Sequence, residues 1–358
     1  MDAAIRTSGS LQQAHGTLTA GNPNRPWRQA AVPVFPDVIC PVDGQALIPS
    51  GDARGAGGAA KLLCTQGHEW VTEAGIPRML RDRRNYADAF GLQWKAFRKT
   101  QLDSYCGTNI SLRRARRCIG PEAWAFLQDH PGSEVLEAGC GAGRFTEILL
   151  ATGARVTSVD LSSAVEANQE NFPQDDRHRV VQADVLRLPF APRQYDMVFC
   201  LGVIQHTPNP DQTMAMLFEQ VRPGGWLVID HYTHELSRYT KTVPFVRQVL
   251  RRLPPETGMK WTERLVDLFF PLHRAVRHSR IGHALVSRIS PVVTYFHCYD
   301  LTDELHRQWA LLDTHDALTD RYKHKRTKGQ IRQQLEHLGG TEIWCEYGGN
   351  GVEARCRC

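Results

Sequence analysis

Residues 135–145, VLEAGCGAGRF, decide the fold of this chain of 358 residues. An apolar run leads into a turn that contains three glycines, and a helical pattern, RFTEILLAT, follows directly. A buried strand, a glycine-rich turn and a helix in this order open the nucleotide-binding unit of a doubly wound α/β fold. We therefore expect a parallel sheet that helices cover on both faces.

The alternation of short apolar runs and helical patterns continues to about residue 235. Strands are predicted in EVLEA, RVTSVD, RVVQAD, YDMVFCLG and WLVIDHY, with helical segments between most of them. The chain ends differently, because TEIWCEY and VEARCRC flank the glycine-rich turn GGNG. This last pattern predicts an antiparallel hairpin at the end of a parallel sheet.

The glycine spacing and one acidic residue indicate which nucleotide is bound. Glycines stand at positions 139, 141 and 143, and Arg144 follows, so the dinucleotide fingerprint G-x-G-x-x-G is not met. Glu137, at the end of the strand, would repel a pyrophosphate. A carboxylate there suits a ligand with an ammonium group, such as S-adenosylmethionine, which also carries a sulfonium and no phosphate.

Two more acidic residues end the next two predicted strands. Asp160 follows Glu137 by 23 residues, close to the offset of about 20 residues at which an acid holds ribose hydroxyls. Asp184 ends the third strand and can accept a hydrogen bond from an adenine amino group, with Leu161 and Val185 beside the ring. Three acids at successive strand ends favour a cationic adenosyl ligand.

The motifs EAGCGAG, VDLS, QADVLRLPF, YDMVFCLGVIQHTPNP and VRPGGWLVI resemble, in order and spacing, those of class I S-adenosylmethionine-dependent methyltransferases of the ubiquinone/menaquinone-methylase-like type (type 11). The resemblance covers residues 134–230 and extends more weakly over the rest of the chain. It implies a Rossmann-like α/β sheet of seven strands in the order 3-2-1-4-5-7-6, with strand 7 antiparallel. It also implies that the cofactor-binding residues are Glu137, Gly139, Gly141, Gly143, Asp160, Leu161, Asp184, Val185 and Leu201.

Catalytic candidates follow the fourth and fifth strands, because ligands of open α/β sheets bind at the carboxyl ends of the strands. His206, in CLGVIQHTPNP, has a side chain suited to a general base, or it only shapes the loop around the adenosyl group. Asp230 and His231 are neighbours on a strand, so at most one of them faces the pocket. Asp230 and His231 are candidates for a base; the alternatives are pocket walls or helix caps.

An N-terminal module carries a candidate metal site. Cys40, Asp43, Cys64 and His68 have the outline of a zinc ribbon. The surrounding sequence resembles the zinc-ribbon module of some rRNA guanine methylases and of a small methylase-activating protein. Aspartate at the second position departs from that pattern, so the alternative is a ribbon that packs without metal.

These patterns divide the chain into five parts. We expect a flexible tail at 1–36, the ribbon-like module at 37–82, a helical cap at 83–132, the methyltransferase core at 133–235 and 301–358, and a helical lid at 236–300. Residues 238–288 hold eleven Lys and Arg against three acids. This basic segment is interpreted as a solvated surface with an apolar packing face. The alternatives are affinity for an anionic acceptor or contact with a membrane surface.

The predicted activity is methyl transfer to an oxygen or carbon of a small-molecule acceptor, either a secondary metabolite, a quinone-like compound or a glycan-linked one. Two alternatives are an RNA methyltransferase that uses the ribbon and a non-catalytic adenosyl-binding regulatory subunit. Against RNA, the net charge is a mild +5 and the N-terminal module lacks a concentrated basic face. No apolar signal segment opens the chain, so a cytoplasmic location is expected. The sequence does not define the acceptor or the oligomeric state.

Overall fold

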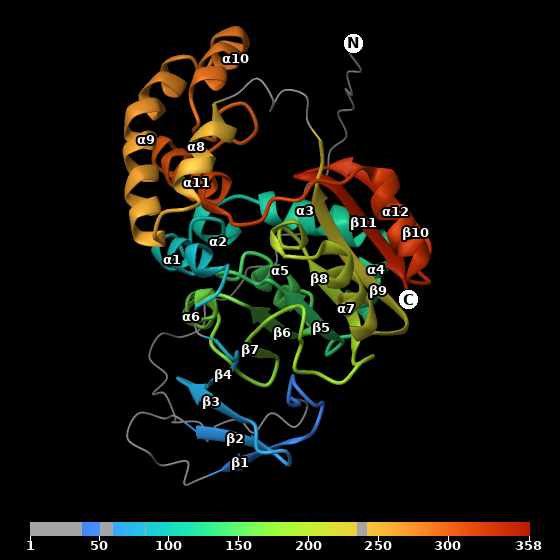
Figure 1. The fold of residues 1–358 in the computed structure, drawn as a ribbon. Helices are drawn as coiled ribbons and strands as arrows, with labels where there is room; N and C mark the ends of the chain where they lie inside the picture. The colour runs from blue at the N-terminus through green and yellow to red at the C-terminus, as the bar shows by residue number, and fades with distance from the viewer. Residues whose placement is uncertain (1–37, 51–59, 83, 235–241) are drawn as a thin grey trace, which may run out of the picture. The chain divides into compact units, whose positions relative to one another are not determined.

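A computed structural model describes residues 38–50, 60–82, 84–234 and 242–358. The tail expected at 1–36 lies outside the described residues. The described part contains one sheet of eleven strands, in the order β1-β2-β3-β4-β7-β6-β5-β8-β9-β11-β10 (Figure 1). The strands are β1 Leu47–Ser50, β2 Ala60–Cys64, β3 Glu69–Glu73, β4 Ile76–Met79, β5 Glu134–Ala138, β6 Arg155–Asp160, β7 His178–Ala183, β8 Tyr195–Cys200, β9 Val221–Tyr232, β10 Thr341–Gly348 and β11 Gly351–Arg357.

Strands β7, β6, β5, β8 and β9 are parallel, and the C-terminal hairpin β10–β11 joins them antiparallel through β9. In the register, Leu136 of β5 lies opposite Val198 of β8, which in turn lies opposite Leu227 of β9. The expected Rossmann-like α/β arrangement is therefore present. All carboxyl ends of the parallel strands meet at one edge, which is where the site is found.

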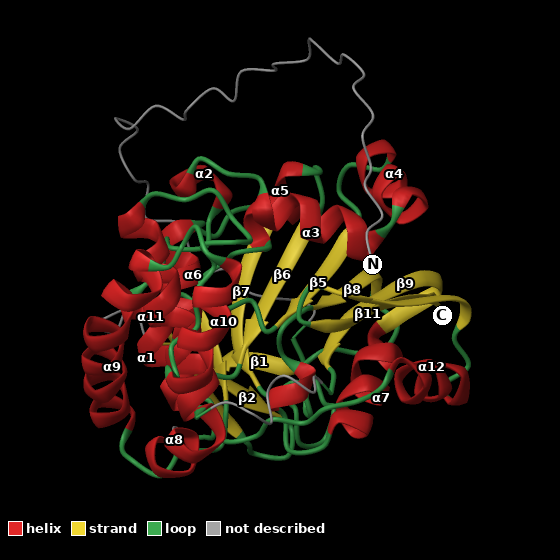
Figure 2. Ribbon diagram, turned by 90° about the horizontal axis from the view of Figure 1, so that it is seen from above, coloured by secondary structure: helices red, strands yellow, loops and turns green. Residues whose placement is uncertain are grey.

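Side chains alternate between the two faces of the sheet, and each face has its own apolar core. Val135 of β5 belongs to a cluster with residues of α3, α4 and α5, whereas the next residue, Leu136, packs with α7 and α12. Figure 2 shows these two groups of helices on opposite faces. Both faces of the central strands are thus buried, which explains their continuous apolar sequences.

Twelve α-helices lie in the described residues. They are α1 Asp88–Ala96, α2 Asp103–Cys106, α3 Ile110–Ile119, α4 Pro121–Asp129, α5 Thr146–Ala151, α6 Ala164–Asn171, α7 Pro210–Gln220, α8 Val243–Leu250, α9 Pro255–Ala275, α10 Arg280–Ile289, α11 Asp303–Thr319 and α12 Lys328–His337. A short 3₁₀ turn, Ile204–His206, follows β8. None of the described helices combines the length and the apolar character that crossing a bilayer requires.

Local sequence explains several helix starts. Asn209 caps α7 by accepting a hydrogen bond from the Gln212 N–H, and Pro210 occupies the first helical position. Thr302 caps α11 in the same way, and Thr327 with Gln330 forms a capping box at α12. These caps fix where α11 and α12 begin and therefore how α11 passes over the sheet edge.

The N-terminal strands β1–β4 form an antiparallel meander that continues the main sheet. Strand β4 pairs in parallel with β7, with Met79 opposite Ala183. Arg78 strengthens this junction, because its guanidinium donates to Gln182 Oε1 at 3.0 Å and to Glu166 Oε1 at 3.1 Å. The prediction of a seven-stranded sheet did not include these four strands.

Candidate active site

A cavity of about 1030 Å³ lies at the carboxyl ends of the parallel strands. Its floor comes from the segments that follow β5, β6, β7 and β8, and its other walls come from α1, α3, α8, α10 and α11. This volume is at the upper end of the range of about 300–1,000 Å³ for small-molecule pockets. It therefore has room for a cofactor and an acceptor together.

The glycine-rich turn forms the floor below β5. Gly139 has a φ of +79°, and a Cβ there would lie 2.1 Å from Val203 Cγ2. Gly141 has a φ of +51° and faces the Trp94 indole, which a Cβ would approach to 3.0 Å. Both positions require glycine because the backbone must turn back under two close side chains. The turn presents its backbone to the cavity, as a nucleoside-binding loop requires.

Asp160, Leu161, Val185 and Leu201, four of the predicted cofactor residues, also line this part of the cavity. Asp160 accepts hydrogen bonds from the Gly141 N–H at 3.0 Å and the Ser162 N–H at 2.8 Å. Ser162 Oγ also donates to Asp160 Oδ1 at 2.7 Å, so Oδ2, which among the described residues accepts only from the Gly141 N–H, keeps a lone pair for a hydroxyl-bearing ligand. These residues fit the adenosyl part of S-adenosylmethionine.

Three predicted cofactor residues do not line the cavity. Glu137 is buried, and its Oε2 accepts from Thr146 Oγ1 at 2.5 Å and Ser158 Oγ at 3.1 Å. Burial raises the pKa of Glu137 to about 7. This placement differs from the predicted contact with an ammonium group, and Glu137 instead fixes the start of α5 behind the turn.

The other two are Asp184 and Gly143. Asp184 accepts from the Leu186 N–H at 3.0 Å and closes the turn that presents Val185. Gly143 packs against the Phe172 ring, which a Cβ would approach to 2.6 Å. Asp184 and Gly143 therefore support the cavity floor without lining it, whereas the next residues in the sequence, Val185 and Arg144, line the cavity.

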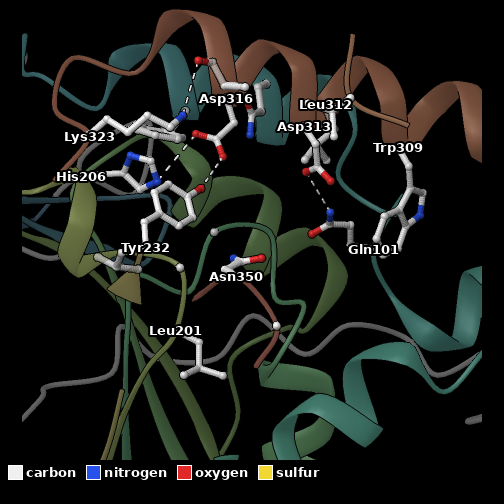
Figure 3. Close-up of a pocket in the computed structure, with 18 of the residues that line it drawn as sticks. Gln101, Leu201, His206, Tyr232, Trp309, Leu312, Asp313, Asp316, Lys323 and Asn350 are labelled. Atoms are coloured by element: carbon white, nitrogen blue, oxygen red, sulfur yellow. Dashed lines mark hydrogen bonds and ion pairs between the residues drawn. The ribbon is translucent and has the colours of Figure 1, made fainter. Parts of the chain in front are cut away.

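At the other end of the cavity, His206 lies between two carboxylates of α11 and the loop that follows it. Its Nδ1 is 3.2 Å from Asp320 Oδ2. Its Nε2 is 3.7 Å from Asp316 Oδ1, and Figure 3 shows the His206 and Asp316 side chains facing each other. Nδ1 also lies 3.2 Å from the Tyr322 carbonyl oxygen. Since both neighbours of Nδ1 are acceptors, we assign the proton of the neutral ring to Nδ1. Nε2 then carries the free lone pair.

The charges around His206 make it a stronger base. Burial by itself would lower the pKa of His206, but Asp316 and Asp320 outweigh burial, so that the pKa is raised above its ordinary value of 6.5. Phe90 and Tyr232 contact the ring edge-on, with centroids 5.1 and 5.2 Å away. The imidazole is thus held in one orientation and shielded from water.

Asp320 and Asp316 have partners of their own. Asp320 is fully buried and is bound by Arg247 Nε at 2.7 Å and Lys323 Nζ at 3.1 Å. Asp316 accepts from the Tyr232 hydroxyl at 3.3 Å (Figure 3). Burial would raise the pKa of Asp320, but Lys323, His206 and Arg247 together outweigh burial and lower it. Asp320 therefore stays ionised and holds His206 in place.

The structure corrects the two strand β9 candidates. Asp230 and His231 are both buried, and neither lines the cavity. Asp230 pairs with Arg114 and accepts from the Gly202 N–H at 2.6 Å. His231 points to the opposite face, where its Nδ1 lies 2.9 Å from the Tyr232 carbonyl oxygen. The next residue, Tyr232, reaches the cavity instead because β9 ends there.

A second polar group lies further along α11. Asp313 accepts from the Tyr295 hydroxyl at 2.5 Å. It also accepts from Gln101 Nε2 at 3.3 Å (Figure 3). Burial raises the pKa of Asp313 to about 6. Arg144 donates to Gln101 Oε1 at 2.9 Å and lies over the Trp309 ring at 5.4 Å. All of these residues line the cavity.

Several cavity residues were not predicted from the sequence. Asp313 and Asp316 of α11, and Lys323 in the loop after it, stand far from the glycine turn in the sequence, and their spacing does not indicate that they line the same cavity. In the sequence Phe90, Trp94 and Phe97 form one helical stripe, a pattern that by itself indicates core packing. In the structure Phe97 packs on a core cluster, whereas Phe90 and Trp94 face the cavity.

The four predicted metal ligands also converge. Sγ of Cys40 and Cys64, a carboxylate oxygen of Asp43 and a ring nitrogen of His68 all lie within 4.8 Å of one another. This cluster lies in the N-terminal meander, and none of its members lines the cavity.

Comparisons with known proteins agree with this geometry. Residues 136–229 match the family described as "Methyltransferase domain". A ubiquinone biosynthesis O-methyltransferase from Chromobacterium violaceum is 27% identical over 199 residues, 52% of this chain and 81% of that protein. The protein of the same name from Pseudomonas entomophila is 28% identical over 130 residues, 35% of this chain and 56% of its own length.

Among solved structures, magnesium protoporphyrin IX methyltransferase from Synechocystis PCC 6803, with bound SAH, matches 76% of this chain and 95% of its own. The identity is 14% and the TM-score 0.40. The family match itself spans the glycine turn and all four strand-end residues of the cavity floor. Residues 136–229 are therefore a methyltransferase domain, and the chain is an S-adenosylmethionine-dependent methyltransferase.

Proposed function

We propose that this methyltransferase acts on a hydroxyl oxygen of a small-molecule acceptor that carries a negative charge. One observation carries the proposal. A single cavity joins the cofactor floor, from Gly139 to Leu201, to the clamped imidazole of His206. The relatives named ubiquinone biosynthesis O-methyltransferase support oxygen as the atom that is methylated.

When bound, S-adenosylmethionine supplies a methyl group on a positively charged sulfur, and an acceptor oxygen attacks the methyl carbon in line with the sulfur, which leaves. The protein must hold the acceptor in line with that methyl and remove the hydroxyl proton. His206 Nε2 is the group suited to accept this proton, because Nδ1 is committed to Asp320 and Tyr322. Asp316, 3.7 Å from Nε2, stabilises the imidazolium that results.

The charge of the acceptor is inferred from the cavity wall. Arg113 of α3 and Arg251, which follows α8, both line the cavity. Neither makes an ion pair or a side-chain hydrogen bond to any residue that the structure describes. Other lining cations, such as Arg114 and Arg247, are already paired with Asp230 and Asp320. A carboxylate or phosphate on the acceptor would supply the missing partner.

The test uses the purified full chain. Titration calorimetry should detect S-adenosylhomocysteine binding and no binding of NAD. Methyl transfer from labelled S-adenosylmethionine is then measured on hydroxybenzoates and on the corresponding uncharged phenols. We expect transfer to the charged compounds, with an O-methyl product by NMR. A C-methyl product would refute the choice of oxygen, and preference for the uncharged phenols would refute the anionic acceptor.

A further inference from the structure

We propose that a tetrahedral zinc site, formed by Cys40, Asp43, Cys64 and His68, links two turns of the N-terminal meander. His68 Nδ1 lies 2.9 Å from Asp43 Oδ2, 3.3 Å from Cys64 Sγ and 3.6 Å from Cys40 Sγ. One ring nitrogen has either one proton or one lone pair, so it cannot bond to three partners. A central cation satisfies all four groups at once.

The two sulfur–nitrogen distances agree with zinc, whereas the nitrogen–oxygen distance of 2.9 Å is shorter than the edge expected around a bound ion. Zinc bonds of about 2.3 Å to sulfur and about 2.0–2.1 Å to nitrogen or oxygen give tetrahedral edges of roughly 3.5 Å from sulfur to nitrogen and roughly 3.3 Å from nitrogen to oxygen. The two observed sulfur–nitrogen distances, 3.3 and 3.6 Å, fall on either side of the first value. Two thiolates with an imidazole and a carboxylate are also ligands that zinc accepts.

The backbone around the ligands supports the same conclusion. Cys40 and Cys64 each stand at the start of a tight turn, and the turns contain Gly44 and Gly67 with φ of +69° and +83°. The His68 N–H donates to Cys64 Sγ at 3.3 Å, which stabilises a thiolate. Both sulfurs are buried, while the His68 side chain is 36% exposed and leaves a path for the ion.

A second cluster with metal-ligand chemistry, His206, Asp316 and Asp320, differs in its surroundings. Arg247 Nε lies 2.7 Å and Lys323 Nζ 3.1 Å from Asp320, so side-chain cations already balance its charge. No lysine or arginine contacts the four-residue cluster within the described chain. The expected occupancy is therefore one zinc per chain, in the N-terminal cluster.

The site is connected to the cofactor floor. The Ile39 N–H donates to the Pro189 carbonyl at 2.8 Å, and Val38 forms a bridge with Phe190. Residues 189 and 190 end the loop that presents Val185 to the cavity. A metal that fixes Cys40 thus also fixes this loop.

Elemental analysis of the full chain purified without chelator tests the proposal, with about one zinc per chain expected. Cys64→Ser should lose the metal, Asp43→Cys should retain it, and Cys106→Ser and His206→Gln serve as controls that keep it. Cobalt-loaded wild type should show the visible bands of tetrahedral cobalt with a sulfur charge-transfer band. Wild type that holds no zinc and gives no such spectrum would overturn the site, even if the variants fail to fold.

A separate observation points to a second surface. We infer that α8 and α10 dock on an anionic lipid surface. On α10, Ile281, Leu285 and Ile289 follow one another at helical spacing and are 77%, 60% and 62% exposed. On α8, Phe245 and Val249 are likewise exposed. Thr242 Oγ1 donates to the Ile289 carbonyl, so the two helices meet at one end.

The charges select the occupant. Residues 242–255 and 268–299 contain no acid, and Arg251, Arg252, Arg280 and Arg288 are exposed beside the apolar stripes. A second copy of this surface would bring like charges together, whereas anionic headgroups complement them. Amphipathic helices of this kind lie in the membrane interface. Arg251, which follows α8, and Ser287 of α10 also line the cavity. If the proposed function holds, a lipid-borne acceptor would therefore enter the cavity from this surface.

Vesicle co-sedimentation tests lipid docking without a measurement of methyl transfer. Wild type should bind phosphatidylglycerol vesicles more than phosphatidylcholine vesicles, and salt should weaken binding. Ile281→Asp with Leu285→Asp should abolish binding, while Ile48→Asp, at an exposed isoleucine of β1, should not. Equal binding by the double variant, or a stable dimer that the double variant dissociates, would refute lipid docking whether or not methyl transfer is found.

Discussion

Nδ1 of His206 lies 3.2 Å from Oδ2 of Asp320, a carboxylate without solvent exposure that Arg247 and Lys323 hold from the other side. This contact fixes the tautomer and the orientation of the imidazole. It also separates two roles on one ring, because Nδ1 is structural and Nε2 faces Asp316 in the cavity.

The first prediction concerns His206 itself. Replacing it with glutamine should lower kcat by about 10²–10⁴-fold, the usual contribution of a general base. Affinity for S-adenosylhomocysteine should stay within about twofold in calorimetry, because the cofactor floor comes from other elements. A kcat close to that of wild type would show that the acceptor needs no base.

The pH profile of kcat/KM gives a second prediction. Only the neutral ring accepts a proton, and the pKa of His206 is raised above 6.5, so the rate should fall below a midpoint higher than 6.5. Asp316→Asn removes a carboxylate that raises this pKa and should move the midpoint to lower pH. Asp267→Asn, an exposed residue of α9, is the matched control. An unchanged profile in D316N would contradict the assignment.

Asp160 provides a third prediction. Asp160→Asn should weaken S-adenosylhomocysteine binding about 10- to 100-fold, as expected for loss of a charged hydrogen bond of about 1.5–3 kcal/mol. Asp184→Asn is the comparison, because this side chain caps a turn and does not line the cavity. If D184N weakened binding as much as D160N, the sequence-based role of Asp184 would be the correct one.

The two ends of the cavity differ in how far the sequence predicts them. The residues of the cavity floor can be predicted locally, because each one stands at or directly after the end of a strand whose pattern is visible in the sequence. The parallel direction of the strands then brings these ends to one edge of the sheet. Even so, Glu137 and Asp184 show that a strand-end acid can turn behind the loop. Whether it does depends on neighbours such as Thr146, which no periodicity reveals.

The acceptor end depends on tertiary packing. Asp316 follows His206 by 110 residues, and it reaches the ring only because α11 passes over the sheet edge. The angle of that helix is set by caps and by packing against α8, α9 and α1, none of which the spacing of motifs encodes. For the same reason the helical stripe of Phe90 and Trp94 could not be divided into core and cavity residues.

Acceptor recognition yields a fourth prediction. Arg113→Gln and Arg251→Gln should each raise KM for a charged acceptor by about 10-fold, the effect of losing about 1.4 kcal/mol. The kcat value and cofactor affinity should change little, since neither arginine contacts His206 or the glycine turn in the structure. Arg252→Gln, an exposed neighbour outside the cavity lining, is the control. Equal KM values for the cavity variants and the control would exclude these arginines from acceptor binding.

The last prediction concerns stability in acid. Burial lowers the pKa of His315 to about 4, and its Nδ1 lies 2.8 Å from Gln93 Oε1, an interaction that joins α11 to α1. An unfolded histidine takes up its proton near pH 6.5, whereas the folded one does so only near pH 4, so folding stability falls as the pH decreases between these values. From pH 7 to pH 5 this one group should lower the free energy of unfolding by about 2 kcal/mol.

His315→Gln removes that contribution, so in urea titrations the variant should lose about 2 kcal/mol less than wild type over this interval. The comparison of the two pH dependences cancels the other titrating groups, and parallel losses in both proteins would show that His315 is not a source of acid sensitivity.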